Sequence, residues 1–273
     1  MDLTTLAINH MTMANASYAT LLRVAKETSC DAVEVRTDLD GPLFDGLNAE
    51  SAGTLAREQG LRILALAEIG AFNDLTADRL EETEQLARTA AACGAGAIVL
   101  IPRNDGYVTS SGTRASDLRF ALGEIRPVLD AHGVIGLVEP LGFETSSLRY
   151  KEEAAEAIEA LTATDTFRIV HDTFHHYLAG DDTFFASHTG IVHVSGVVSS
   201  GPIAQLVDED RQLVDENDRL GNIEQLRTLV QDGYTGPVSI EAFAPIVHAS
   251  SDPGAALRGS LNHITASLAA DAA

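Results

Sequence analysis

The chain has 273 residues, of which 45% are apolar and 21% charged, a composition typical of a folded globular protein rather than a disordered, fibrous or membrane protein. This length accommodates one large domain or two small ones. The 18 Lys and Arg residues against 40 Asp and Glu give a net charge of −22, and because so acidic a surface repels phosphate backbones and anionic lipid, we expect neither nucleic acid nor a membrane as a partner.

Short runs rich in β-branched residues recur along the whole chain and predict buried strands. They cover residues 5–9, 32–37, 62–68, 97–102, 134–140, 168–172, 190–196 and 237–243. Their nearly continuous apolar character is typical of a parallel sheet that is covered on both faces.

Amphipathic segments between these runs predict helices over 17–28, 76–93 and 222–232. The second segment opens at Thr76, whose hydroxyl can cap the first turn, and stops at Gly94, a residue type that suits the position after a helix. Alternating strands and helices without a Pro, Gly or Ser linker favour a single α/β domain over 1–273, a (β/α)8 or TIM barrel. A doubly wound open sheet is the alternative, but no glycine-rich phosphate turn follows the first run.

The cysteine content and the N-terminus predict where the protein resides. Cys30 and Cys93 are too few for a disulfide framework and fit a reducing compartment. The N-terminal segment is acidic where a signal peptide is basic, and no apolar run approaches the roughly 18 residues of a spanning helix. We therefore expect a cytoplasmic protein.

Polar side chains stand at the carboxyl ends of the predicted strands, where barrel active sites lie. They are Glu34, Arg36, Glu68, Glu139, Asp172, His193 and Glu241. A charged group inside an apolar strand costs several kcal/mol unless it is paired or bound to a metal. We therefore expect a compensating partner for this group of residues.

Glu139, Asp172, His193 and Glu241 come from four successive strands and form a set of three carboxylates and one imidazole. This set suits one divalent cation such as Mn2+, Mg2+, Co2+ or Zn2+, and the lack of Cys argues against a structural zinc site. A dication would also offset three carboxylates that could not all stay ionised together. Any single member could instead form a structural pair, and Asp172 could cap a helix.

Three histidines crowd the segment HDTFHH. If a helix starts at Thr173, His175 shares the inward face of its first turn, which predicts a substrate-binding residue. His171 and His176 then point elsewhere, as packing or supporting groups. His10, at the end of the first strand, is a candidate for the lining of the pocket.

Around these residues the chain resembles the xylose isomerase-like TIM-barrel family of sugar isomerases and epimerases, and most closely its 2-keto-myo-inositol (inosose) isomerases. The resemblance covers nearly the whole chain and rests on the segments DAVEVRTDL, ILALAEIGAFND, GLVEPLGF, HDTFHHYLAG, IVHVSG, DEDR and GYTGPVSIEAFAP. It implies that Glu139, Asp172, His193 and Glu241 are the metal ligands and that His175 meets a substrate oxygen.

The segment 212–222 departs from the glycine-rich turn that follows the DEDR-like arginine in many relatives. Arg211 and Arg219 consequently compete for the substrate-binding role, which we assign to Arg211. We also predict that Glu34 and Arg36 bind substrate, the alternative being that they brace each other across the barrel mouth.

These features together predict a divalent-metal-dependent isomerase or epimerase of a small sugar or keto-inositol. Proton transfer would pass through an enediolate, with Glu139 and Glu241 as base and conjugate acid. A lyase or dehydratase on the same barrel and a non-catalytic sugar-binding subunit are the alternatives. A phosphodiesterase acting on DNA is disfavoured by the charge of −22. A homo-oligomer is left open.

Overall fold

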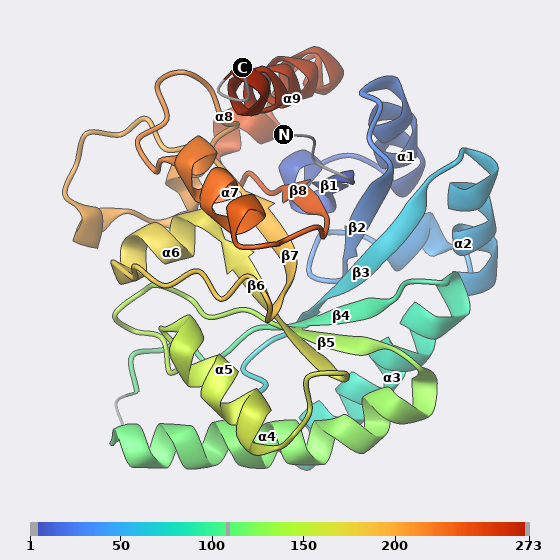
Figure 1. The fold of residues 1–273 in the computed structure, drawn as a ribbon. Helices are drawn as coiled ribbons and strands as arrows, with labels where there is room; N and C mark the ends of the chain where they lie inside the picture. Colours follow the sequence, from blue (N-terminus) through green and yellow to red (C-terminus); the bar gives the residue numbers. More distant parts are fainter. Residues whose placement is uncertain (1–4, 108–109, 271–273) are drawn as a thin grey trace.

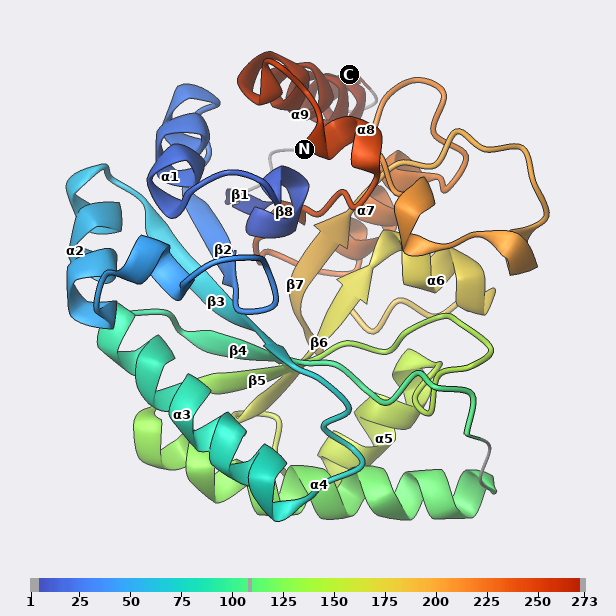
Figure 2. The same ribbon diagram turned by 180° about the vertical axis from the view of Figure 1, so that it is seen from behind.

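The structure is a computed structural model that describes residues 5–107 and 110–270, and its strands close into a barrel (Figures 1 and 2). The strands are β1 (Leu6–Asn9), β2 (Ala32–Arg36), β3 (Arg62–Ile69), β4 (Ala97–Leu100), β5 (Ile135–Val138), β6 (Phe167–Asp172), β7 (Thr189–Val194) and β8 (Val238–Ile240). Each pairs in parallel with the next, and β8 pairs with β1 to close the ring. Every predicted run overlaps one strand, so the predicted TIM barrel is confirmed and the open-sheet alternative is wrong.

Helices surround the strands on the outside of the barrel (Figure 1). They are α1 (Tyr18–Glu27), α2 (Ala49–Glu58), α3 (Ala77–Cys93), α4 (Ser111–His132), α5 (Lys151–Ala160), α6 (Thr173–Ala179), α7 (Asn222–Gln231), α8 (Pro245–His248) and α9 (Pro253–Ala270). The predicted start and stop of α3 are confirmed, because the Thr76 hydroxyl accepts from the Arg79 amide and Gly94 adopts the left-handed conformation.

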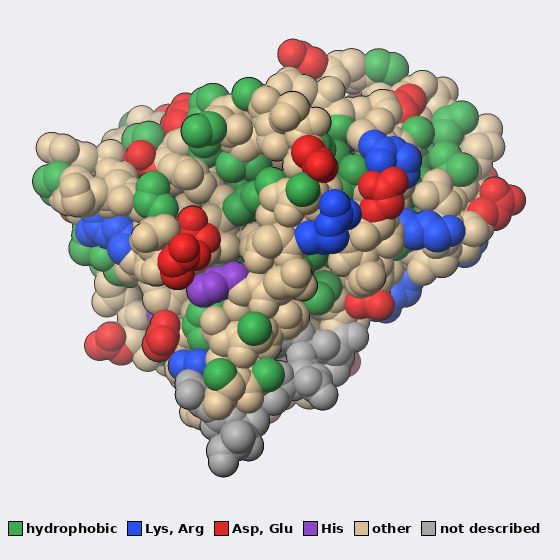
Figure 3. All heavy atoms as spheres, turned by 90° about the horizontal axis from the view of Figure 1, so that it is seen from above, with side chains coloured by type: hydrophobic (Ala, Val, Ile, Leu, Met, Phe, Trp, Pro, Cys, Tyr) green, Lys and Arg blue, Asp and Glu red, His purple; other side chains and the backbone are tan. Residues whose placement is uncertain are grey.

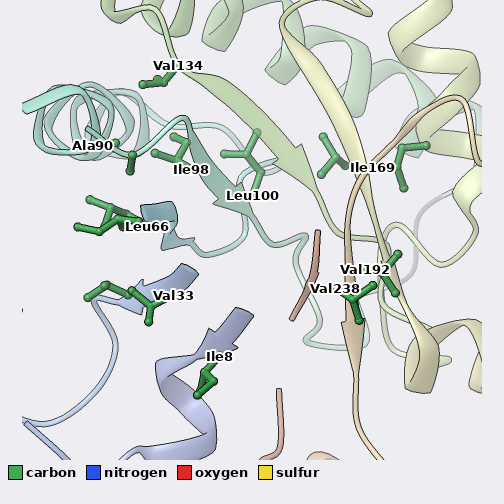
Figure 4. Packing of buried hydrophobic residues seen from close by; sticks show 14 of the residues in the cluster. Ile8, Val33, Leu66, Ala90, Ile98, Leu100, Val134, Ile169, Val192 and Val238 are labelled. Atoms are coloured by element: carbon green, nitrogen blue, oxygen red, sulfur yellow. The ribbon is translucent and has the colours of Figure 1, made fainter. Parts of the chain in front are cut away.

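Side chains alternate between the two faces of each strand and so fill two separate spaces. Outward residues such as Leu66, Ile98 and Val192 pack in the main core, which lies between strands and helices (Figure 4). Inward residues such as Leu137 and Ile191 form a second cluster inside the barrel. Every second residue of a strand faces the inside of the barrel. The inward residues in the middle of the strands are apolar, and those at the carboxyl ends are polar.

The connection between β7 and β8 is the longest in the chain, and most of it is irregular. It contains short 3-10 turns at Ile203–Gln205 and Asp208–Asp210 and then α7. An antiparallel bridge between Gly196 and Gln212 fastens it to the end of β7. The departing segment 212–222 is thus held against the barrel mouth by backbone hydrogen bonds.

Acidic side chains are spread over the face seen in Figure 3, among hydrophobic and basic ones, rather than gathered in one patch. This distribution agrees with an acidic charge that mainly solvates the surface. Within residues 5–107 and 110–270, no helix combines the length and the apolar character needed to cross a membrane.

Candidate metal centre

The four predicted metal ligands meet at the carboxyl end of the barrel. Asp172 and His193 lie at the ends of β6 and β7, and Glu139 and Glu241 follow β5 and β8 directly. Each offers one ligand atom, and these atoms all lie within 4.8 Å of one another. Their side chains are only 1% to 5% exposed. The convergence follows from the strand periodicity, since Glu139 and His193 stand two residues after the inward Leu137 and Ile191.

His193 is oriented by a carboxylate that is not itself in the cluster. Its Nε2 lies 3.2 Å from the Glu34 carboxylate, a side chain with no exposed surface. Its Nδ1 faces Glu241 Oε2 at 3.3 Å and Glu139 Oε2 at 3.6 Å, yet it has no hydrogen-bond partner among the described residues. When the ring is neutral and the Glu34 carboxylate accepts the Nε2 proton, the lone pair lies on Nδ1, the arrangement usual for a metal-ligating histidine.

The donor set of this centre therefore fits a divalent cation. Three carboxylates and one imidazole suit ions of intermediate hardness, and the buried Nδ1 without a partner is aimed at the space that the carboxylates share. Asp172 also confirms its expected capping geometry, because its Oδ1 accepts from the His175 amide at 2.8 Å, where α6 begins. Its Oδ2 accepts from Arg211 Nη2, so the same carboxylate both caps α6 and pairs with a guanidinium beside the cluster.

Two arginines compensate the carboxylates, a contribution that the sequence analysis did not include. Arg211 Nη2 donates to Asp172 Oδ2 and, at 2.8 Å, to Glu241 Oε2, while Arg36 Nη1 donates to Glu241 Oε1 at 3.1 Å. The Arg211 guanidinium lies 4.4 Å from the centre of the Phe243 ring. Guanidinium groups therefore supply part of the compensation that the sequence predicts for these carboxylates.

The surroundings push the acidities of the two glutamates in opposite directions. Burial raises the pKa of Glu139 to about 7, although His193 opposes the shift. Burial acts on Glu241 in the same sense, but His193, Arg211 and Arg36 outweigh it and hold its pKa below the ordinary value. Burial would lower the pKa of His193, yet the carboxylates of Glu241, Glu34 and Glu139 outweigh it and raise that pKa. The cluster thus contains carboxyl groups of very different proton affinity.

Glu34 and Arg36 do not brace each other. Glu34 contacts His193, whereas Arg36 pairs with Asp38 at 2.6 Å and with Glu68 at 2.7 Å in addition to Glu241. Both side chains contact candidate metal ligands, and the described contacts include no ion pair between the two; substrate binding by them stays a prediction.

Arg211, rather than Arg219, lies at the centre. Arg219 instead donates to the carbonyl groups of Ser199 and Gly201 and to the Tyr177 hydroxyl, so it stabilises the long connection before β8. The structure therefore separates the two arginines that compete in the sequence analysis.

His175 is enclosed beside Asp172. Its ring makes edge contacts with Phe143 and Phe174, at centroid distances of 5.1 and 5.3 Å, and its buried Nδ1 has no partner in the part of the chain that is described. Burial lowers its pKa, which keeps the imidazole neutral. His10 bonds the Ala16 carbonyl oxygen through Nε2 at 2.9 Å and lines a cavity of about 40 Å3 together with Arg36.

Sequence reasoning missed Asn9 as a member of the site. Its Nδ2 donates to Glu241 Oε1 at 2.9 Å and to Glu34 Oε1 at 3.4 Å, so one amide connects the candidate ligand Glu241 with the carboxylate that contacts His193. Asn9 is the last residue of β1. The rule that selects polar residues at strand ends would have found it.

Comparison with known proteins places this geometry in context. A family model described as "Xylose isomerase-like TIM barrel" matches residues 22–266. The crystal structure of a xylose isomerase domain containing protein from Salmonella typhimurium is 31% identical in sequence, with a TM-score of 0.90, and the match covers 98% of this chain and 99% of that one.

More distant structures share the fold. The IolI protein with a bound zinc atom is 19% identical, with a TM-score of 0.87 over 97% of this chain and 98% of that one. D-psicose 3-epimerase with D-tagatose, from Clostridium cellulolyticum, is 14% identical, with a TM-score of 0.76 over 97% of this chain and 99% of that one. A cyclic amide hydrolase of Rhodococcus is 35% identical over 114 residues, but the match spans only 39% of this chain and 30% of that protein's length.

Proposed function

Because the chain belongs to the xylose isomerase-like TIM barrel family, we propose that it is a divalent-metal-dependent isomerase or epimerase of a small sugar or keto-inositol. The observation that carries the proposal is the buried convergence of Glu139, Asp172, His193 and Glu241, where His193 Nδ1 has no hydrogen-bond partner among the residues that the structure describes. A zinc atom in the IolI protein and sugar epimerases of the same fold support it.

Under this proposal each residue of the cluster has a distinct task. Glu139, Asp172, His193 and Glu241 would hold the cation. Bound there, a divalent ion supplies Lewis-acid charge that makes a C–H bond beside a carbonyl more acidic. Glu139 and Glu241 follow strands on different parts of the ring, so they can remove and return a proton on two faces of a substrate.

Neighbouring side chains would orient the substrate and exclude water. Neutral His175 can hold a substrate oxygen, and Arg211 presents its guanidinium between Asp172 and Glu241. The two arginines that touch the cluster are already paired with carboxylates, so within residues 5–107 and 110–270 the centre offers no free guanidinium to a phosphate. We therefore propose an uncharged polyol as substrate.

Metal analysis combined with hydrogen exchange tests the proposal. Purified protein should contain about one divalent ion per chain, His193→Gln should lose it, and His188→Gln, which alters a histidine between β6 and β7, should keep it. The protein should incorporate solvent deuterium beside the carbonyl of an inosose or ketose from a panel. Loss of water from the substrate would instead indicate a lyase, and absence of both metal and exchange would contradict the proposal.

A further inference from the structure

Lys151 is an unusual residue in this chain. The sequence contains only two lysines, Lys26 and Lys151. Lys26 is exposed on α1, whereas Lys151, the first residue of α5, is only 5% exposed. No carboxylate among the described residues lies within 4 Å of Lys151 Nζ, so the structure bears the cost of burying an amine without an ion pair.

Two imidazoles provide the hydrogen bonds of this amine. Lys151 Nζ lies 3.0 Å from His171 Nδ1 and 2.9 Å from His176 Nδ1, and it faces the Phe184 ring at 5.2 Å from the ring centre. The same Phe184 ring stacks on His171 at a centroid distance of 5.4 Å. The network therefore joins α5, β6, α6 and the segment that follows α6.

The partners of Gln225 determine which atoms donate. Its Nε2 donates to the carbonyl oxygens of Thr173 and Leu220, which leaves its Oε1 to accept from His171 Nε2 at 3.0 Å. His171 consequently carries its proton on Nε2, and its Nδ1 can only accept from Lys151. A lysine ammonium group has only donor hydrogens, so His176 Nδ1, at 2.9 Å from the same Nζ, also accepts from it.

The two histidines bracket the site residues of the same segment. His171 precedes Asp172 on β6 and points to the helical layer, because neighbouring residues of a strand face opposite sides. His176 follows His175 on α6. A single amine therefore ties both ends of the stretch that carries Asp172 and His175.

A small cavity connects the network directly to the metal centre. The residues that line a space of about 10 Å3 include Lys151 and His176 of the network as well as Asp172 and His175 of the centre. A space of this size holds about one water molecule. A change in the position of the lysine would therefore reach the two site residues without an intervening layer of side chains.

We propose that Lys151 is a positioning residue of the metal centre, which fixes the directions of the Asp172 carboxylate and the His175 ring through His171 and His176. The inference rests on the proposed function. An apolar side chain of the same length would fill the space but could not direct two imidazoles, whereas an amine holds both rings by hydrogen bonds. The cost of a buried amine without an ion pair is consistent with a role other than stability.

Cobalt binding to the variant Lys151→Met tests this role, with Lys26→Met as the matched loss of the other lysine. Titration of Co2+ into metal-free protein gives the dissociation constant, and the visible absorption of the bound Co2+ reports its ligand geometry. We expect Lys151→Met to bind Co2+ about 10-fold more weakly with an altered spectrum, as when other outer partners of metal ligands are removed. Its urea midpoint should equal or exceed that of the wild type, and Lys26→Met should match the wild type in binding and spectrum.

The outcomes separate the two proposals. Wild-type affinity and an unchanged spectrum in Lys151→Met would overturn the positioning role alone. Wild-type protein that takes up no Co2+ would overturn the proposed function and this role with it. If Lys151→Met does not fold, Lys151→Gln replaces it in the test. Because Gln keeps an uncharged donor, its Co2+ affinity should fall by less than the 10-fold expected for Met, and wild-type affinity in Lys151→Gln would also overturn the role.

Discussion

The variant Glu34→Gln tests whether Glu34 orients His193 for metal binding or instead binds substrate. Glu34 has no exposed surface, and its carboxylate lies 3.2 Å from His193 Nε2, so it keeps the ring proton on Nε2 and the Nδ1 lone pair toward the cluster. An amide oxygen at this position is a weaker acceptor than a carboxylate. If the amide NH2 group faces Nε2 instead, it favours the ring tautomer that carries the proton on Nδ1. Loss of such an outer partner typically lowers metal affinity about 10- to 100-fold, which corresponds to about 1.4 to 2.8 kcal/mol.

The dissociation constant of Zn2+ or Mn2+, measured by competition with a fluorescent chelator, checks this expectation. Glu58→Gln, which removes one exposed carboxylate at the end of α2, controls for the change in net charge. Glu34→Gln should bind the ion more weakly, and Glu58→Gln should match the wild type. Equal affinity in Glu34→Gln, with only a higher KM for substrate, would refute the reasoning and assign Glu34 to substrate binding.

Three further predictions concern metal, proton transfer and packing. A free ion at a concentration 100 times its dissociation constant adds about 2.7 kcal/mol to the free energy of unfolding. Excess chelator should therefore lower the melting temperature by roughly 5 to 10 °C, and identical melting curves would argue against a resident ion. Glu241→Gln, assayed at saturating metal with the metal content measured, should lose about 100-fold or more in turnover, and unchanged turnover at normal metal content would contradict the proton-transfer scheme. Gly53→Ala should destabilise the protein in urea unfolding, because the new Cβ would lie 2.1 Å from the Cys93 carbonyl oxygen. Gly123→Ala, whose Cβ would meet no neighbouring atom within 4 Å, should raise the free energy of unfolding by about 0.5 to 1 kcal/mol. Equal effects of the two variants would show that helix propensity, not packing, decides.

The pairing of a charged side chain was harder to predict than its position. Arg36 and Glu34 lie beside the cluster, but the sequence did not reveal their partners, because each bonds a residue on a distant strand. Glu241, for example, is separated from Arg36 by 205 positions and from Asn9 by 232. No local pattern reports which of several inward side chains a guanidinium will reach.

Lys151 shows the same limit in the helical layer. Its place at the start of a helix suggests an exposed side chain, since charged residues are rarely buried without a pair. Burial becomes evident only when α5 packs against β6 and α6 and brings Lys151 to two histidines that lie 20 and 25 positions away. His171 and His176 were expected to be packing or supporting groups, and the structure identifies the amine that contacts both of them.

Periodicity along the chain was sufficient for the barrel and for the meeting of Glu139, Asp172, His193 and Glu241, because parallel neighbouring strands bring their carboxyl ends to one place whatever the details of packing. Only the folded molecule shows that His193 Nδ1 has no hydrogen-bond partner among the described residues, that guanidinium groups lie beside Glu241 and that Lys151 is buried. Hydrogen bonds and ion pairs act over about 3 to 4 Å, so their partners depend on distances that arise only when segments remote in sequence are packed together.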